Sequence, residues 1–321
     1  MPESHPVVKA YVLPGMPHTL LAAEQNQGWQ RVRQGFEQVR QDLAEADIDV
    51  LVIYSTMWPS VIGHQIQADP QPAWTHVDEL FHDLGSISYQ LRMDQAYAEA
   101  YCAAARERGL HARTVAYKGF PIDTGSVVVL KLINPDNRLP AVIVSSNVYA
   151  DRVETVVLGK AAVDALQQQG KKAAAIVVTQ LSNRMHQQFI DPAEDHIHSL
   201  KDQEWNLKVL EFLEAGRLED VSQLSRQIHR EARVAKVVNF KPFWWLAAAA
   251  GQHNRYTGKV YAYEPIFGTG AAVVGLDRAE RPARNLEFDE EDPDQYTGDR
   301  NVLEAADPGN NVPAEPETEA S

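Results

Sequence analysis

The chain has 321 residues, of which 44% are hydrophobic and 23% charged. That is enough apolar material for one large domain or two modest ones. The single cysteine, Cys102, excludes a disulfide framework and cysteine-based zinc sites. No stretch approaches the roughly 20 apolar residues of a membrane span, and the N-terminus lacks the basic-then-apolar pattern of a signal peptide. A cytoplasmic protein is therefore expected.

The net charge of −14 is concentrated at the C-terminal end. Residues 287–321 carry 12 acidic side chains and one basic side chain, so the first 286 residues carry a net charge of only about −3. This last segment is rich in Pro, Glu and Asp and poor in aliphatic residues, which predicts a disordered acidic tail after one α/β domain over residues 1–286. Without a basic stripe, nucleic-acid binding is excluded.

The first part of the chain predicts a strand, a helix and a second strand. Val7–Leu13 has the composition of a strand, and Trp29–Ala46 carries apolar residues along one stripe of a helix. Val50–Ile53 is apolar throughout, which indicates a strand buried on both faces, and Pro59 is expected to end its pairing. Such a unit implies parallel strands and a right-handed crossover. The polar segment Gln65–Asp78 is expected to be a loop.

The remaining chain continues the alternation of helices and strands, which predicts an α/β fold with a central, mostly parallel or mixed sheet flanked by helices. Ser126–Ile133 fits either a helix or a strand. The other expected helices are Asp94–Arg108, Arg152–Gln169, Asp202–Ala215, Asp220–Ala232 and one starting at Phe243. The other expected strands are His111–Tyr117, Ala141–Ser145, Ala173–Thr179 and the glycine-interrupted Tyr261–Gly275.

Ligands of open α/β sheets bind beyond the carboxyl ends of the strands. His18 and His64 each follow a predicted strand end, and Glu264 lies in another such segment. Two histidines and one carboxylate from separate loops are the ligand set of non-haem Fe(II) sites, although histidines near loops are more often hydrogen-bonding residues. The chain has no Gly-x-Ser-x-Gly motif of serine hydrolases, and Gly268-Thr269-Gly270 lacks the Lys-Ser/Thr of a phosphate loop.

These strand ends resemble those of the class III extradiol ring-cleavage dioxygenases. LPGMPH resembles the family's A-P-H-x-P-H, VLVIYSTMWPSVIGHQ its S-P-H-W and later G-H, TQLSNRMH its S-H segment, and YAYEPIFGTGAAVV its C-terminal strand. The resemblance covers Val7 to Leu276. Its closest likeness is to the iron-free α subunits of two-subunit aminophenol dioxygenases, in the stretches YSTMW, HVDE, GFPIDTG, IDPAED and EWNLKVLEFLEAG.

The resemblance implies four chemical positions, and this chain departs from the family at all of them. Family members bind Fe(II) with two histidines and one glutamate and use a further histidine as acid and base. The two metal histidines are replaced by Gly15 and Met57, the acid/base histidine by Asn183, and an ungapped alignment puts Lys259 at the metal glutamate. Glycine has no donor, a thioether is soft, and a lysine cation opposes a metal ion.

Other residues are implied as pocket residues. His18 and His64 correspond to second, neighbouring family histidines, which the resemblance places near the substrate. Asp123 is expected either to cap the amides of Thr124-Gly125 or to line the same pocket, and Trp58 is a further candidate.

Three functions are compatible with these residues. In the first, the chain is a non-catalytic α-type subunit that binds no cofactor and supports a related subunit, whose Fe(II) cleaves an aminophenol- or catechol-type ring. In the second, the chain is itself an Fe(II) dioxygenase with the substitute ligands His18, His64 and Glu264. In the third, it is a binding protein that holds a small aromatic ligand near Met57, Trp58 and Asn183. The loss of all four positions favours the first, as a hetero-oligomer or, failing that, a homo-oligomer.

Overall fold

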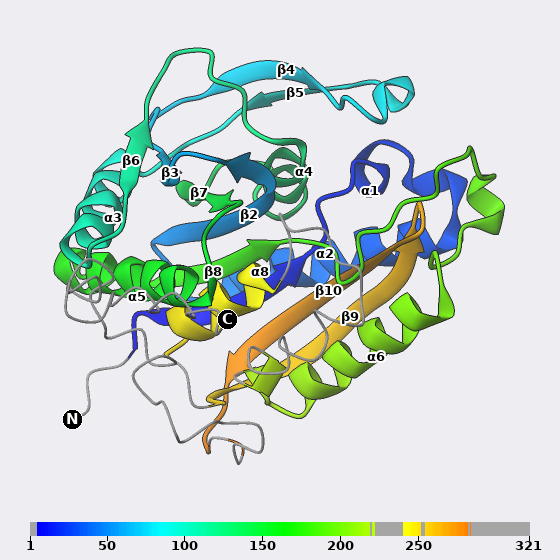
Figure 1. Ribbon diagram of the computed structural model, residues 1–321. Helices are drawn as coiled ribbons and strands as arrows, with labels where there is room; N and C mark the ends of the chain where they lie inside the picture. Colours follow the sequence, from blue (N-terminus) through cyan, green and yellow to red (C-terminus); the bar gives the residue numbers. More distant parts are fainter. Residues whose placement is uncertain (1–4, 219, 222–239, 252–253, 282, 284–321) are drawn as a thin grey trace, which may run out of the picture.

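The computed structural model describes residues 5–218, 220–221, 240–251, 254–281 and 283 (Figure 1). The expected helix Asp220–Ala232, apart from its first two residues, and the expected acidic tail lie outside the described residues. Of the helices that are described, none has both the length and the apolar character needed to cross a bilayer.

An eight-stranded sheet forms the centre of the fold, in the order β6-β3-β7-β2-β8-β1-β10-β9 (Figure 1). The four strands β7, β2, β8 and β1 pair in parallel, whereas β10 is antiparallel to both β1 and β9. The predicted α/β fold with a mixed central sheet is confirmed. The strands are β1 (Val7–Leu13), β2 (Val50–Ser60), β3 (His64–Gln67), β6 (Ala112–Val115), β7 (Ala141–Asn147), β8 (Ala173–Val178), β9 (Tyr256–Ile266) and β10 (Thr269–Arg278).

Helices cover both faces of the sheet. The described α-helices are α1 (His18–Leu21), α2 (Gln27–Glu45), α3 (Gln95–Glu107), α4 (Thr124–Ile133), α5 (Arg152–Gln169), α6 (Leu200–Glu214) and α8 (Lys241–Ala249). The 3₁₀ helices within the described residues are η1 (Ala23–Gln25), η2 (His82–Leu84) and η3 (Pro192–Glu194). A separate ribbon of β4 (Ala73–Val77) and β5 (Ser86–Gln90) lies beyond α4 (Figure 1).

Side chains of the strands alternate between two hydrophobic cores. In β1, Tyr11 and Leu13 point to the face covered by α2 and α4, which we call the α2 face. Ala10 and Val12 point to the opposite face, covered by α3, α5, α6 and α8, which we call the α5 face. This alternation follows from the period of two in a strand. Two side chains on opposite faces are separated by the sheet itself.

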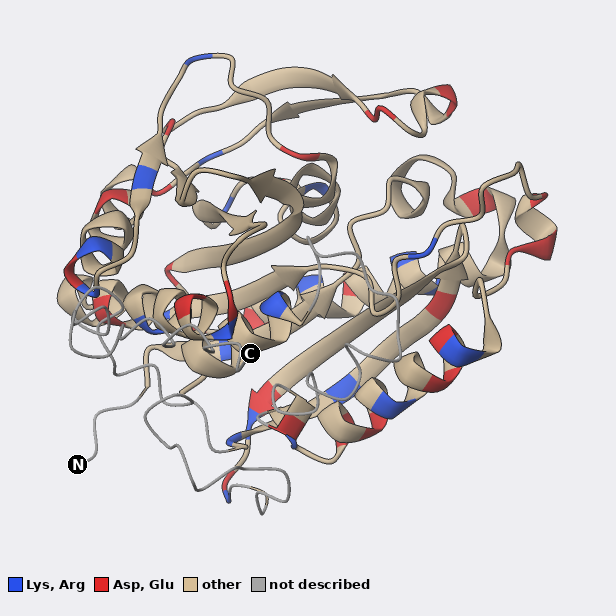
Figure 2. Cartoon of the chain, in the orientation of Figure 1, with Lys and Arg blue, Asp and Glu red and all other residues tan. Residues whose placement is uncertain are grey.

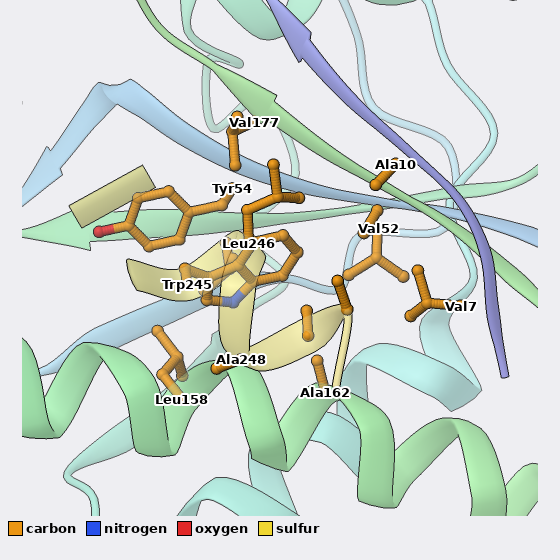
Figure 3. Packing of buried hydrophobic residues seen from close by; sticks show 14 of the residues in the cluster. Val7, Ala10, Val52, Tyr54, Leu158, Ala162, Val177, Trp245, Leu246 and Ala248 are labelled. Carbon is orange, nitrogen blue, oxygen red and sulfur yellow. The ribbon is translucent and has the colours of Figure 1, made fainter. Parts of the chain in front are cut away.

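Trp245 of α8 fills the centre of the α5 face (Figure 3). Its indole ring stacks on the ring of Tyr54 at a centroid distance of 5.6 Å, and its Nε1 donates to the hydroxyl of Tyr101 at 2.9 Å. A Cβ atom on Gly159 of α5 would lie only 2.6 Å from the Trp245 carbonyl oxygen. The close approach of α5 to α8 therefore requires glycine at this position.

β2 continues past its predicted end and includes Pro59. The pairing with β7 shifts register between Ser55 and Pro59, so Met57 and Trp58 lie in an irregular stretch of the strand. A proline is tolerated at such an irregularity because its missing N–H is not needed for a regular ladder.

The structure corrects two expected secondary-structure assignments and decides a third that the sequence left open. The expected loop Gln65–Asp78 contains most of β3 and all of β4. The expected strand Tyr261–Gly275 is a hairpin, because the chain reverses at Phe267 and Gly268, whose φ angles are +49° and +84°. Glycine adopts such angles without a steric cost. Ser126–Ile133 is helical and belongs to α4.

Candidate functional site

The carboxyl ends of β1, β2 and β8 meet at one edge of the sheet, where a site was expected. The amide of Thr179 donates to the carbonyl of Leu13 at 2.9 Å, and Thr56 Oγ1 donates to the carbonyl of Val178 at 2.9 Å. These bonds hold the loop after β1 beside the irregular part of β2. Three of the four expected positions follow or end these strands, namely Gly15, Met57 and Asn183.

The side chain of Met57 lies between two glycines. A Cβ atom on Gly15 would be 2.5 Å from Met57 Sδ and 2.7 Å from Gly125 Cα, and a Cβ atom on Gly125 would also be 2.5 Å from Met57 Sδ. Such distances are far below van der Waals contact. The thioether thus occupies the space that a side chain at position 15 would need. We call Gly15, Met57 and Gly125 the thioether slot.

The thioether slot does not suit the Fe(II) of the family. Fe(II) sites of this kind use imidazole and carboxylate ligands, whereas glycine supplies no donor and a thioether is a soft one. Over the residues that the structure describes, no three His, Cys, Asp or Glu side chains are grouped so that they could hold a metal ion.

Asn183 follows β8 at the same edge of the sheet, and its neighbour Ser182 ties this segment to β10. The amide of Gly270 donates to the Ser182 carbonyl at 2.9 Å, and Asn206 Nδ2 donates to Ser182 Oγ at 2.8 Å. The segment that carries Asn183 is therefore anchored through Ser182, and Asn183 itself has an amide side chain, which does not act as a general base at neutral pH.

Lys259 lies away from the thioether slot. It is exposed on β9, with its ammonium 5.1 Å from the centre of the Tyr261 ring. It pairs with Gly275, which pairs with Tyr11 in the middle of β1. Gly15 is four residues further on, about 13 Å along an extended strand. The structure therefore does not bring Lys259 next to Gly15.

His18 begins α1 on the α2 face and is only 3% exposed. Its ring contacts Trp29 and Phe81 edge to face, with centroid distances of 4.8 and 4.5 Å, and stacks near Phe267 at 5.9 Å. Its Nδ1 has no hydrogen-bond partner among the described residues. Burial lowers the pKa of His18 to about 4, although nearby carboxylates, first among them Asp195, act in the opposite direction. The ring is therefore neutral at pH 7.

His64 is buried on the other side of the sheet. It starts β3 and shares a face with Ile66, which belongs to the core of the α5 face. Burial, reinforced by the charge of Lys241, lowers the pKa of His64 to about 4. Lys241 begins α8, is 1% exposed, and donates from Nζ to the carbonyls of Asn147 and Val148 at 2.6 and 2.9 Å.

The substitute ligands of the second hypothesis are not brought together. Glu264 forms an ion pair with Arg31 of α2 and therefore lies on the α2 face. His18 is on the same face, but it is enclosed by aromatic rings, and His64 is on the α5 face. A single ion cannot reach ligands on both sides of a continuous sheet.

Asp123 has the capping role that was expected, but at a different amide. Its carboxylate accepts from the amide of Ser126 at 2.9 Å and from Ser55 Oγ at 2.8 Å, and so caps α4 and fixes it to β2. Burial raises the pKa of Asp123, while these hydrogen bonds act against the rise. Trp58 packs against Phe120, with ring centroids 5.8 Å apart. Both residues therefore have structural partners.

Asp195 was not singled out from the sequence, yet its side chain is completely buried. Its carboxylate accepts from Trp29 Nε1 at 2.9 Å and from the amides of Phe267 and Gly268 at 2.7 and 3.0 Å. It thereby joins the loop after β8 to α2 and to the β9–β10 turn. No local pattern marks this role, because all three donors are distant in the sequence.

Steric coupling within the thioether slot gives a first prediction. Gly125→Ala is expected to lower the free energy of unfolding by about 1–3 kcal/mol through overpacking against Met57 and Val178. Met57→Ala alone is expected to cost about 2–4 kcal/mol as a cavity. In the double variant, the loss of unfolding free energy is expected to be smaller than the sum of the two single losses by about 1 kcal/mol or more. Urea denaturation measures all three losses.

The matched control for this cycle is Leu158→Ala, a cavity on the α5 face. Combined with Gly125→Ala, it is expected to be additive, because the two sites share no contact. Additive costs for Gly125→Ala and Met57→Ala would show that the thioether does not occupy the position described here.

Comparison with known proteins identifies the class. The family model described as "Catalytic LigB subunit of aromatic ring-opening dioxygenase" matches residues 9–274. The chain therefore belongs to this family of aromatic ring-opening dioxygenases, as the strand-end motifs predicted.

Two relatives are subunits of one enzyme. The chain is 32% identical over 269 residues to the 2-aminophenol 1,6-dioxygenase alpha subunit of a Pseudomonas species, and the match covers 84% of this chain and 98% of that subunit. It is 28% identical over 286 residues to the beta subunit of 2-aminophenol 1,6-dioxygenase from Pseudomonas, covering 84% and 93%.

A solved structure supports the fold alone. The crystal structure of an uncharacterized protein from Escherichia coli K12 is similar with a TM-score of 0.58 and 13% sequence identity. The similarity covers 84% of this chain and 99% of that one.

Proposed function

We propose that this chain is a non-catalytic, α-type subunit that supports a related Fe(II)-containing subunit, which cleaves an aminophenol- or catechol-type ring. The observation that carries the proposal is the thioether slot, where the sulfur of Met57 fills the space beside Gly15. At position 15, where the resemblance puts the first metal ligand, glycine supplies no donor, and a Cβ atom there would lie 2.5 Å from Met57 Sδ. The edge of the sheet around it is nevertheless fully formed and hydrogen-bonded.

The similarity of this chain to both subunits of a two-subunit enzyme supports the proposal that it pairs with a related catalytic subunit. Because this chain matches an alpha and a beta subunit over 84% of its length in each case, a catalytic partner of the same fold is the natural counterpart. Twofold dimers use the same surface patch on both copies of a fold, and two related subunits can pair in the same way about an approximate twofold axis. The chain would then contribute to the stability of the partner and would bind no cofactor itself.

The proposal is tested with this chain and a related chain that keeps the two histidines and the glutamate of the family. Each is purified alone and after co-expression, loaded anaerobically with Fe(II), and assayed for iron per chain and for oxygen uptake with 2-aminophenol and catechol. We expect no stoichiometric iron and no uptake with this chain alone. In the co-expressed complex we expect one iron for each related chain, and ring cleavage that depends on both chains.

Control variants distinguish the role of this chain from that of the related chain. Replacing an iron-ligating histidine of the related chain by alanine is expected to abolish oxygen uptake by the complex, whereas Met57→Leu in this chain, which keeps the volume of the side chain, is expected to leave it unchanged. Stoichiometric iron with oxygen uptake in this chain alone would overturn the proposal. So would two chains that stay separate at micromolar concentration while the related chain is fully active.

A further inference from the structure

The ribbon of β4 and β5 is separate from the central sheet, and β4 forms its free edge (Figure 1). β5 is fixed to the body of the protein. Its residues Ile87 and Tyr89 are buried in the core of the α2 face, and Asn137 Nδ2 donates to the carbonyl of Gln90 at 2.8 Å. Within the described residues, β4 pairs with β5 alone. Four of the five residues of β4 are exposed, and only His76 is partly buried.

β4 lacks the charges that protect an edge strand from other chains. Natural edge strands carry charged residues or proline, because their unpaired N–H and C=O groups otherwise pair with another strand. The two edges of the central sheet follow this rule, with an exposed Arg113 on β6, and an exposed Lys259 and Pro265 on β9. β4 has the sequence AWTHV, without Asp, Glu, Lys or Arg, and Figure 2 shows both strands of the ribbon in tan.

Protective residues lie instead at the two ends of β4. Pro72 precedes the strand, and Asp78 and Glu79 follow it. A proline cannot donate to a ladder and so ends strand pairing. The acidic residues of the turn after β4 are red in Figure 2. Pairing with another chain is therefore confined to the five residues Ala73–Val77.

The sequence of β4 is complementary to itself in the antiparallel direction. A twofold axis at Thr75 sets this residue opposite Thr75 of a second copy. The same axis sets Trp74 opposite His76. It sets Ala73 opposite Val77, so that all five residues are paired. Directly opposite residues point to the same face of a sheet, and threonine pairs and aromatic pairs are favourable there.

This register also buries apolar surface and separates the acidic turns. The indole of Trp74 is 56% exposed, whereas Tyr89, its neighbour on β5, is buried. Val77 is 47% exposed. A second chain along β4 removes part of this apolar surface from water. Asp78 falls opposite Pro72 and lies six residues, or about 20 Å, from Asp78 of the second copy.

We propose that two copies of this chain pair through antiparallel β4 strands about a twofold axis at Thr75, which gives a four-stranded sheet in the order β5-β4-β4-β5. Such an interface uses the same surface on both copies and closes as a dimer. A second copy is the partner that fits, because the uncharged edge is complementary to itself. The inference does not rest on the proposed subunit role, since this chain forms the interface alone.

Sedimentation velocity of the full chain over a concentration range of about 1–100 µM tests the proposal. One pair of short strands buries little surface compared with an obligate dimer, so we expect a reversible dimer with a dissociation constant on the order of 10 µM. Thr75→Lys places two cations opposite each other on the axis and is expected to weaken the dimer at least about tenfold.

Ser88→Lys is the matched control for Thr75→Lys. Ser88 is exposed and lies directly opposite Thr75, with the two hydroxyl oxygens 3.1 Å apart. Either substitution removes this hydrogen bond and adds one positive charge. Ser88 is on β5, however, three strand spacings or about 14 Å from Ser88 of the second copy. Ser88→Lys is therefore expected to change the dissociation constant by no more than about twofold.

Two further measurements locate the axis. A mixture of Thr75→Lys and Thr75→Glu is expected to dimerise at least as tightly as the unmodified chain, although each variant alone stays monomeric, because opposite charges then meet on the axis. Thr75→Cys is expected to form an intermolecular disulfide on mild oxidation, whereas Ser88→Cys is too far from its copy to do so. The native Cys102 is buried and does not compete.

The proposal is overturned if the unmodified chain remains monomeric at about 100 µM, or if Thr75→Lys and Ser88→Lys weaken the dimer equally. A mixture of Thr75→Lys and Thr75→Glu that stays monomeric would also overturn it, because the axis would then lie elsewhere. A chain that is monomeric alone and uses β4 only to bind a different subunit would likewise reject the second copy as the partner.

Discussion

Lowering the pH from 6.5 to 4 is expected to reduce the free energy of unfolding by about 3 kcal/mol for each of two buried histidines, His18 and His64. Both rings stay neutral in the folded protein until about pH 4, because burial disfavours their charged form. In the unfolded chain they bind protons from about pH 6.5 downward. The unfolded state therefore gains protons first, and stability falls throughout this window and levels off below it.

Urea denaturation at intervals between pH 4 and 7 measures this effect. His64→Leu is expected to make the decline shallower by about 3 kcal/mol across the window. Ile66→Val, in the same strand and on the same face, lowers stability by a small and pH-independent amount and serves as the control for packing. If the unmodified chain and His64→Leu show parallel declines, the histidine takes up its proton in the folded state and the expectation is wrong.

Asp195→Ala is expected to destabilise the protein by about 3 kcal/mol or more. The substitution leaves three donors without an acceptor, namely Trp29 Nε1 and the amides of Phe267 and Gly268. Each hydrogen bond to a charged acceptor contributes about 1.5–3 kcal/mol, and buried donors left unpaired add a desolvation cost. Thermal and urea denaturation measure the global loss. Hydrogen exchange at the amides of Phe267 and Gly268 measures local opening of the β9–β10 turn.

Asp191→Ala is the matched control for this substitution. Asp191 lies in the same loop, but it is exposed and its carboxylate caps only the amide of Ala193 at 2.9 Å. The loss of such a cap costs about 1 kcal/mol. Equal effects of Asp191→Ala and Asp195→Ala, with unchanged exchange at the turn, would contradict the role given to Asp195.

Local patterns in the sequence predicted the main elements because those elements depend on local rules. The buried stripe of α2, for example, contains Trp29, Val32, Phe36, Val39 and Leu43, as its helical spacing indicated. The edge where β1, β2 and β8 meet followed from the topology of parallel strands. Position 15 was placed at this edge by the motif after the first strand, and the structure puts Gly15 there in contact with Met57.

What the sequence did not predict depends on contacts between distant segments. The alternation of Gln65–Asp78 is too short and polar to distinguish strands β3 and β4 from a loop. Nothing near Asp195 shows that its partners lie 166 and 72 residues away. Likewise, the spacing of His18 and His64 does not show that the sheet separates them. The sequence also did not show where Lys259 lies on the sheet, which is on β9 opposite Gly275.

The thioether slot opposes the stepwise introduction of a histidine at position 15. A lineage that starts from this sequence and substitutes Gly15→His first brings the new Cβ atom to within 2.5 Å of the Met57 sulfur and 2.7 Å of the Gly125 backbone. Replacing Met57 by a shorter residue first removes only the clash with its sulfur, leaves the clash with the Gly125 backbone, and loses the packing of the Met57 side chain. Neither first step is neutral, and the complete path also requires α4 to shift. The packing of Gly15, Met57 and Gly125 thus makes each single substitution toward a histidine at position 15 destabilising, so the present combination of residues is easier to keep than to reverse.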